Sequence, residues 1–249
     1  MFPIRDHNPS RRTPLVTYLI IAVNVAVFLG ELRYAGDPRA IDAFFYTWGL
    51  VPVAVTLGGD VVGIFTSMFI HGGFLHLAGN MLFLYIFGDN LEDRFGHFGF
   101  AVFYLVSGVG AALFQVAVSP WSDVPMVGAS GAIAGVLGGY LLLFPRARVD
   151  VLVVLILFVT VINVPAWFML GLWFLLQLVN GLAQATEATG VAYWAHAGGF
   201  LAGVLAALPW WLRAGGPAFW HQSAGRPAHP ETHYRFAPTR VPRVPRRRR

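Results

Sequence analysis

Residues 127–144 of the chain read VGASGAIAGVLGGYLLLF, a short polar turn that leads into an unbroken apolar stretch. The stretch is about as long as the roughly 17–25 residues that a helix needs to cross a bilayer. Ser130 lies where the turn becomes the helix, at one end of the predicted span. A hydroxyl in that place is a candidate nucleophile, so these residues predict both a membrane-spanning helix and hydrolysis inside the membrane.

The composition of the whole chain agrees with a membrane protein. Hydrophobic residues make up 57% and charged residues 12% of the 249 residues, whereas an average soluble domain has about 25% charged residues. We therefore expect an all-α polytopic membrane protein. The 17 basic residues are all Arg and lie mainly in the two tails, which argues against nucleic acid as a partner. The absence of Cys excludes disulfides, thiolate metal sites and a Cys nucleophile. We expect no cofactor and no metal.

Apolar blocks divide the chain into a membrane domain and two tails. We expect a cytoplasmic N-terminal segment at 1–14, a membrane domain at 15–212, and a disordered, Arg- and Pro-rich cytoplasmic tail at 213–249. The first block follows several Arg residues and resembles a signal peptide, but further spans follow, so we interpret it as a retained anchor. The predicted spans are residues 15–32, 69–87, 100–118, 127–144, 164–182 and 193–212.

The apolar block before residue 182 begins near residue 151 and could hold one span or two. With six spans and the N-terminus inside, Arg33 and Arg39 are the only Arg residues outside, whereas seven spans would place the Arg-rich tail outside. The positive-inside tendency therefore favours six spans, with both termini cytoplasmic. The fifth span then starts near Val164, and residues 151–162 are expected to form a buried or interfacial approach segment.

The second, fourth and sixth spans carry unusual polar residues that lie at one common depth. They are His71, His76 and Asn80 in the second span, Ser130 in the fourth and His196 in the sixth. These three spans run in the same direction, and each polar residue comes early in its span. Ionisable residues inside a membrane are costly unless they face the bundle interior, so they are functional candidates.

Small residues predict that the fourth and sixth spans touch. His196 is followed three and seven residues later by Gly199 and Gly203, and Ser130 begins a ridge of Gly and Ala residues. Such ridges allow helix backbones to approach closely in lipid. We expect this contact to bring the Ser130 hydroxyl within hydrogen-bonding reach of the His196 imidazole.

This pair of side chains suits nucleophilic catalysis. A serine hydroxyl becomes a good nucleophile when a neighbouring imidazole accepts its proton. The spans contain no carboxylate at the same depth to orient the base, because Asp89 lies at the inner end and Asp123 in an outer loop. The sequence therefore favours a Ser–His dyad. Donors for a developing oxyanion would come from Asn80, from His76 and from backbone N–H groups beside the serine.

Four motifs in this order resemble those of the rhomboid intramembrane serine proteases. They are HGGFLHLAGN at residues 71–80, LEDRFG at 91–96, GASG at 128–131 and AHAGG at 195–199, with Gly203 after the last. The resemblance covers most of residues 15–212 and implies a six-helix rhomboid-like bundle. From the charged LEDRFG block we expect hydrogen bonds to helix ends at the inner surface.

The resemblance implies an activity and roles for individual residues. Ser130 would be the nucleophile and His196 the base, and the rhomboid pattern places His76 and Asn80 in the oxyanion hole. The implied substrates are single-pass transmembrane proteins in membrane lipid, cut near the outer face. We expect the protein in the inner (plasma) membrane of a bacterium. Gly131 is a further candidate for the oxyanion hole, and the expected supporting residues are His71, Gly128, Gly199 and Gly203.

Two positions depart from the rhomboid pattern. Many members have Trp-Arg before the first His of the second span, where this chain has Val62 and Gly63. Some members carry an aromatic residue four positions after the nucleophile that packs against the base, where this chain has Ala134. The first departure concerns the anchoring of the outer loop, and the second concerns the pocket beside His196.

Other classes of protein fit parts of the pattern. A catalytically inactive rhomboid-like protein that binds membrane clients is the main alternative, but it would be expected to lack the Ser or the His. A transporter would need a polar path through the whole bundle, and the polar residues here collect in the outer half. Taken singly, each histidine could also make only an interhelical hydrogen bond.

Overall fold

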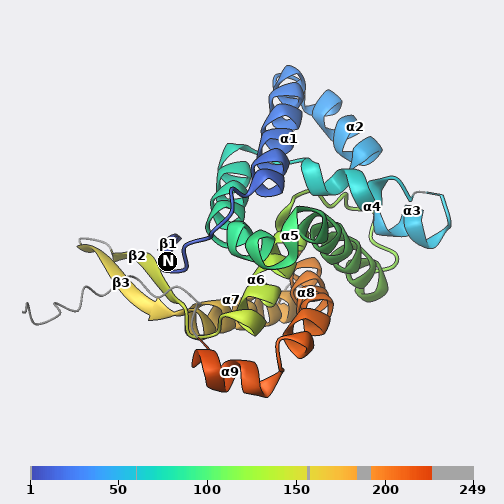
Figure 1. Ribbon diagram of the computed structural model, residues 1–249. Helices are drawn as coiled ribbons and strands as arrows, with labels where there is room; N and C mark the ends of the chain where they lie inside the picture. The colour runs from blue at the N-terminus through green and yellow to red at the C-terminus, as the bar shows by residue number, and fades with distance from the viewer. Residues whose placement is uncertain (1, 60, 156–157, 184–191, 226–249) are drawn as a thin grey trace, which may run out of the picture.

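Helices dominate the structure of the chain (Figure 1). The computed structural model describes residues 2–59, 61–155, 158–183 and 192–225. Four of the described helices are long and apolar enough to cross a membrane, namely α1 with the short 3-10 turn after it, α5, α7 and α8, and α6 is a shorter apolar helix. The helices are α1 (Leu15–Glu31), α2 (Pro38–Trp48), α3 (Pro52–Thr56), α4 (Gly63–Thr66), α5 (Phe74–Val118), α6 (Ser130–Leu143), α7 (Ala166–Ala183), α8 (Tyr193–Arg213) and α9 (Pro217–Ser223).

Helix α5 consists of two arms joined by a sharp turn. Gly96 has φ 72° and ψ 165°, a backbone conformation that glycine adopts without steric cost. The second arm returns along the first. The rings of Phe95 and Phe103 lie 5.0 Å apart across the turn, and Gly108 of the second arm packs against Met68, which precedes the first arm. The two arms coincide with the second and third apolar blocks of the sequence.

A buried carboxylate fastens α1 to this turn. Glu92 is 1% exposed, and its two oxygens accept hydrogen bonds from the backbone N–H groups of Val16 and Thr17, each at 2.8 Å. The Thr17 hydroxyl donates a third at 2.7 Å. Negative charge is favourable at a helix N-terminus, and α1 has no side-chain cap of its own at this end. The LEDRFG block thus makes the helix-end hydrogen bonds that the sequence predicts.

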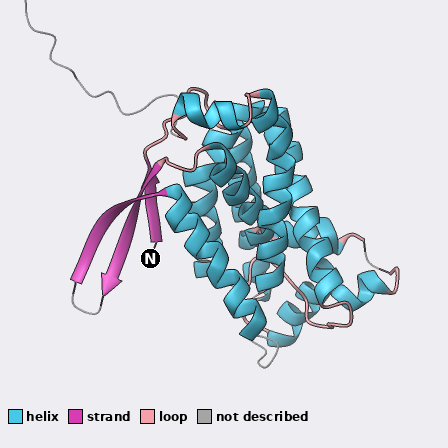
Figure 2. Cartoon of the chain, turned by 90° about the horizontal axis from the view of Figure 1, so that it is seen from below, coloured by secondary structure: helices cyan, strands magenta, loops and turns pink. Residues whose placement is uncertain are grey.

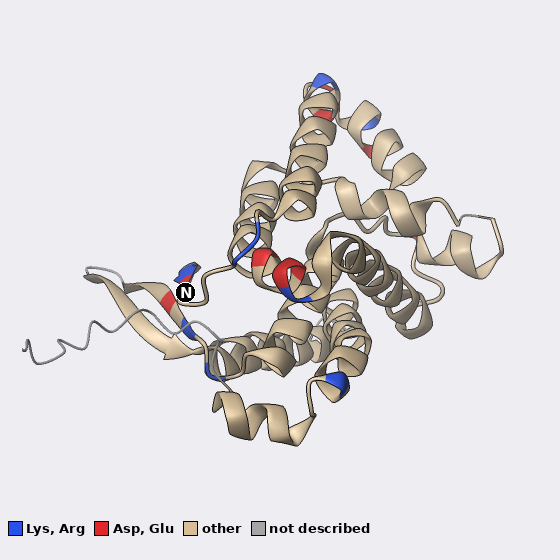
Figure 3. Cartoon of the chain, in the orientation of Figure 1, with Lys and Arg blue, Asp and Glu red and all other residues tan. Residues whose placement is uncertain are grey.

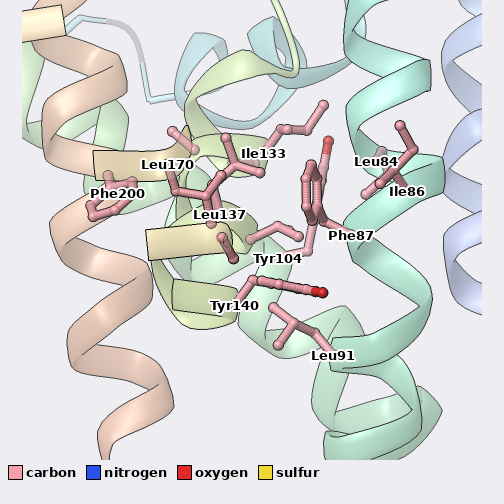
Figure 4. Close-up of a cluster of buried hydrophobic side chains, with 14 of the residues drawn as sticks. Leu84, Ile86, Phe87, Leu91, Tyr104, Ile133, Leu137, Tyr140, Leu170 and Phe200 are labelled. Carbon is pink, nitrogen blue, oxygen red and sulfur yellow. The ribbon is translucent and has the colours of Figure 1, made fainter. Parts of the chain in front are cut away.

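Helix α6 lies at the centre of the bundle, with α5, α7 and α8 around it (Figure 1). Every residue from Gly131 to Tyr140 is buried, as expected for a helix that is apolar on all sides. Large side chains of α5 fill the space between the helices, with the rings of Phe87 and Tyr140 4.9 Å apart (Figure 4). Ser130 is therefore held at one end of the most buried helix.

A three-stranded antiparallel sheet stands beside the helices (Figure 2). Its order is β1 (Phe2–Asp6), β2 (Arg148–Leu155) and β3 (Phe158–Pro165). The sequence pattern predicts no strands, and residues 151–162 are expected only to form a buried or interfacial approach segment. The strands were not predictable from periodicity, because a short run of Val, Ile and Leu has no clear hydrophobic period. Only its content of β-branched residues favours a strand.

The C-terminal side also differs from the sequence-based expectation. Disorder is predicted from residue 213 onward, but α9 lies within that region. Its Trp220 indole N–H donates to the Leu142 carbonyl at 2.9 Å, and the backbone N–H of Arg146 donates to the Gly225 carbonyl at 2.8 Å. These contacts dock α9 on the end of α6 opposite Ser130. The rest of the predicted disordered tail, residues 226–249, lies outside the described residues.

Candidate active site

A tight turn presents Ser130 at the first position of α6. Gly128 in this turn has φ +134°, which side chains other than glycine rarely adopt, and its N–H donates to the Ser67 carbonyl at 2.9 Å. A Cβ atom at Gly128 would lie 2.9 Å from His76 Nε2 and 3.3 Å from Ser130 Oγ. Glycine thus leaves room for both side chains beside the turn.

Ser130 and His196 form a hydrogen-bonded pair. Ser130 Oγ lies 2.8 Å from His196 Nε2, with the serine on α6 and the histidine near the start of α8. The two helices touch through glycine backbones, since a Cβ atom at Gly199 would lie 2.0 Å from the Gly131 carbonyl oxygen, and one at Gly203 would lie 2.0 Å from the Gly135 oxygen. This is the close packing that the small-residue spacing predicts.

Three further groups predicted from the sequence line the same cavity as the serine. The imidazole of His76 lies across Gly128 from Ser130, as the distances above show. Asn80 is 8% exposed, and its Nδ2 has no hydrogen-bond partner among the described residues. Gly131 is the second residue of α6, so its N–H belongs to the first turn, where helix N–H groups lack intrahelical partners. Candidate donors on α5 and α6 thus line one cavity together with Ser130.

A cavity of about 1060 Å³ opens beside these groups. Ser130, His196, His76 and Asn80 all line it, together with apolar residues such as Trp173. A mostly apolar cavity with a few convergent polar groups is the usual form of a binding site for an extended or small ligand.

His71 supports the site from behind His76. Its ring is 1% exposed and packs edge-on against the His76 ring, with the centroids 5.1 Å apart. Its backbone N–H donates to the Glu31 carboxylate of α1 at 3.3 Å. No cluster of three or more His, Cys, Asp or Glu residues is placed to hold a metal ion in the part of the chain that the structure describes.

Sequence reasoning missed two residues of α7 that contact the base. Gln177 Oε1 lies 2.8 Å from His196 Nδ1, and the Trp173 ring lies 5.9 Å from the His196 ring at an interplanar angle of 34°. The base is hydrogen-bonded here to a neutral amide instead of the Asp or Glu carboxylate expected for a third residue, and a neutral amide is cheaper to bury than a charged carboxylate. Gln177 could have been identified from the sequence as a polar residue within an otherwise apolar span. Trp173 supplies, from another helix, the aromatic contact that Ala134 lacks.

Comparison with known proteins agrees with this architecture. Residues 58–213 match the family description "Rhomboid domain". The chain is 31% identical to Rhomboid protease AarA of Providencia stuartii over 134 residues, which are 49% of this chain and 48% of that protein. It is 32% identical to the mitochondrial Rhomboid protein 1 of Saccharomyces cerevisiae over 200 residues, 76% of this chain and 51% of the yeast protein. Rhomboid protease GluP of Bacillus subtilis is 31% identical over 128 residues, 51% of this chain and 24% of that protein.

The helical fold and these matches define an integral membrane protein of the rhomboid class. The chain belongs to the rhomboid family. It spans about half the length of the first two relatives.

Proposed function

We propose that the chain is an intramembrane serine endopeptidase that cleaves transmembrane segments of single-pass proteins. The observation that carries the proposal is the 2.8 Å hydrogen bond between Ser130 Oγ and His196 Nε2 beside a cavity. Relatives with protease in their names support it. An inactive client-binding protein would have no need of an activated serine.

The arrangement suggests how each group acts. His196 Nε2 accepts the hydroxyl proton while Ser130 Oγ attacks the scissile carbonyl carbon, and the imidazolium then gives that proton to the leaving amine. A water repeats the sequence and releases the second product from the acyl-enzyme. Asn80, His76 and the first-turn N–H of Gly131 stabilise the carbonyl oxygen as it becomes negative.

Six membrane crossings account best for the helices. The two arms of α5 count as two spans, and α1, α6, α7 and α8 supply the rest. Arg residues outside the bundle then fall mainly on the side that carries both termini, which makes that side cytoplasmic. Under this topology Ser130 lies toward the outer face, and substrates are cut near that face.

A serine-directed fluorophosphonate probe tests the proposal directly. Purified protein in detergent should be labelled and should cleave single-pass substrates, because a paired imidazole activates Ser130. Ser130→Ala and His196→Ala should each abolish both signals while leaving membrane insertion intact. Ser122→Ala is the matched control, since Ser122 also lines the cavity but lies in a loop and contacts the Val124 backbone.

The outcomes separate the candidate functions. Labelling and cleavage that depend on both residues support a protease. A wild-type protein that inserts correctly but neither reacts nor cleaves would leave the inactive client-binding protein as the better description. Activity near that of wild type in either variant would refute the dyad.

A further inference from the structure

Gln177 is buried in the middle of an apolar helix and makes two hydrogen bonds. It is 8% exposed, its Oε1 lies 2.8 Å from His196 Nδ1, and its Nε2 donates to the Trp173 carbonyl at 3.2 Å. The second hydrogen bond uses the amide nitrogen and so directs the amide oxygen to the imidazole.

This orientation decides which nitrogen of His196 carries the proton. An amide oxygen can only accept, so the neighbouring Nδ1 must be the protonated nitrogen of the neutral ring. The other nitrogen, Nε2, then has a free lone pair that faces the Ser130 hydroxyl. A base needs this tautomer to take the serine proton. The Trp173 ring lies beside the same imidazole, with the ring centroids 5.9 Å apart.

We propose that Gln177 is a positioning residue that fixes the tautomer and the ring orientation of His196. The proposal rests on the proposed function for its catalytic consequence. When Nε2 accepts the serine proton, the imidazolium keeps its Nδ1–H, and the hydrogen bond to the amide oxygen becomes charge-assisted and stronger. No proton passes to Gln177. The titratable neighbours of His196 among the described residues are His76 of α5 and Tyr193 of α8.

The first measurement does not depend on activity. Nitrogen NMR of histidine-labelled protein distinguishes the two neutral tautomers, and the His196→Gln spectrum identifies the His196 signals. Wild-type protein should show the Nδ1–H form, and Gln177→Met, which keeps the size but cannot accept this hydrogen bond, should show a mixture. An unchanged tautomer in Gln177→Met would overturn the proposal, whether or not the protein is a protease.

Kinetics give the second measurement. Gln177→Met should lower kcat by at least about tenfold with little change in KM. Gln177→Glu keeps the acceptor, so it should retain activity and move the acidic limb of the pH profile to higher pH, because a carboxylate stabilises the imidazolium more than an amide does. Asn180→Leu removes the other amide side chain of α7 and should change neither readout. If Gln177→Glu were as impaired as Gln177→Met with an unshifted pH profile, the role of Gln177 would be merely structural.

A separate observation concerns the sheet, which has one covered face and one uncovered face. Val149, Val151 and Val153 of β2 are buried. The alternate residues point away from the bundle. Phe2 (59%), Val154 (55%), Val159 (69%) and Val161 (50%) are exposed on this uncovered face, and Ile4 (44%) and Ile162 (37%) are exposed elsewhere on the sheet.

Polar groups collect at the other end of the same strands. Asp150 accepts a hydrogen bond from Asn163 at 2.7 Å and pairs with His7 at 2.9 Å and with Arg5 at 3.5 Å. Figure 3 shows the charged residues of the sheet near the helices, whereas the distant part of the strands carries none. The sheet is thus polar at its base and apolar toward its tip.

We infer that this uncovered apolar face lies against the acyl chains of the leaflet at the end of the bundle opposite Ser130. The strands join the ends of α6 and α7, two apolar helices of the membrane domain, so their base lies at the membrane surface. An apolar patch exposed to water is unfavourable, and lipid is the partner already present there. The outer edge of β3 has backbone groups to satisfy, so the sheet lies at the boundary with the headgroups rather than deep in the hydrocarbon.

Spin labels can locate this face because the chain has no natural cysteine. Single labels at Val154→Cys, Val159→Cys and the control Asn163→Cys would be measured in vesicles of phosphatidylcholine and phosphatidylglycerol. Labels at Val154 and Val159 should collide more with oxygen than with a water-soluble nickel chelate, and the label at Asn163 should show the reverse. Strong nickel collisions at the Val positions would overturn the inference, as would protection from both reagents, which would indicate a protein partner.

Discussion

Burying a polar side chain beside Ser130 costs free energy unless the side chain makes a hydrogen bond. His196 has Ser130 and Gln177 as its two partners, whereas the Asn80 amide nitrogen has none among the described residues. An unpaired buried donor usually costs about 1–3 kcal/mol. A donor that lines the same cavity as the nucleophile and has no partner in the described part of the resting protein suits an oxyanion that forms only during the reaction.

Asn80→Ala therefore tests the oxyanion role. It should lower kcat by roughly 10²-fold with little change in KM, because the lost hydrogen bond forms only in the transition state. Labelling of Ser130 by a fluorophosphonate should persist, and His76→Ala should behave in the same way. Steady-state kinetics on one purified substrate provide the measurement, and a change confined to KM would contradict the assignment.

At the scale of elements, the contact between α6 and α8 sets the distance between nucleophile and base. A methyl group at Gly203 would clash with the Gly135 carbonyl, and backbone atoms of packed helices cannot move aside as a flexible side chain can. Overpacking of this kind costs about 1–3 kcal/mol or more.

Gly203→Ala should therefore separate the two helices and break the hydrogen bond between Ser130 and His196. We expect a lower Tm in detergent and a large loss of fluorophosphonate labelling. The matched control is Gly171→Ala on α7, where a Cβ atom would meet nothing within 4 Å. Equal Tm values and labelling rates for the two variants would show that the close approach is unimportant.

Strand β1 contributes a pH dependence at the same scale. Burial raises the pKa of Asp6 from 3.8 to about 7, the nearby Asp89 adds to the rise, and a hydrogen bond from the Tyr140 hydroxyl opposes it. Below pH 4 the folded and unfolded states both hold the proton. Between pH 4 and 7 the unfolded state loses it first, so the free energy of unfolding falls as the pH rises.

Asp6→Asn should remove this dependence, because the amide has no proton to lose in that range. The loss of stability in the wild type between pH 4 and 7 is at most about 4 kcal/mol. Thermal unfolding in detergent at pH 5 and pH 8 measures it, and the variant should show a smaller difference in Tm than the wild type. An equal difference would mean that another group is responsible.

At the scale of the whole molecule, α9 closes the end of the bundle opposite Ser130. Truncation after Arg226 should leave Tm and cleavage unchanged, because the contacts of Trp220 and Gly225 remain. Truncation after Arg213 removes both contacts and should lower Tm. The two truncated proteins, compared in the same detergent, separate the role of α9 from that of the tail, and a loss of activity in the longer one would give the tail a larger role.

The proposed position of Ser130 toward the outer face predicts which substrates the proposed protease should cut. A peptide carbonyl in a membrane helix is shielded by its own turn, and unwinding in lipid leaves polar groups unsatisfied. Substrates should therefore carry Gly, Pro or other helix-weakening residues near the outer end of their span. Replacing these residues with Leu should reduce cleavage, and mass spectrometry should map the cut near that end. Unchanged cleavage of the Leu variant, or a cut near the inner face, would refute this account.

The long apolar helices and the pairing of Ser130 with His196 can be predicted from the amino-acid sequence. The length of an apolar segment and the spacing of its small residues are local patterns. They can be recognised without knowing how distant segments of the chain are arranged. Three features appear only in the folded protein: Gln177 and Trp173 contact the base, residues 148–155 and 158–165 form strands, and α9 docks on α6. The sequence around a neutral amide in an apolar helix does not indicate which side chain the amide will contact. An apolar run without a clear hydrophobic period can form either a helix or a strand. In both cases the partner comes from a distant part of the chain, so the result depends on how the helices pack.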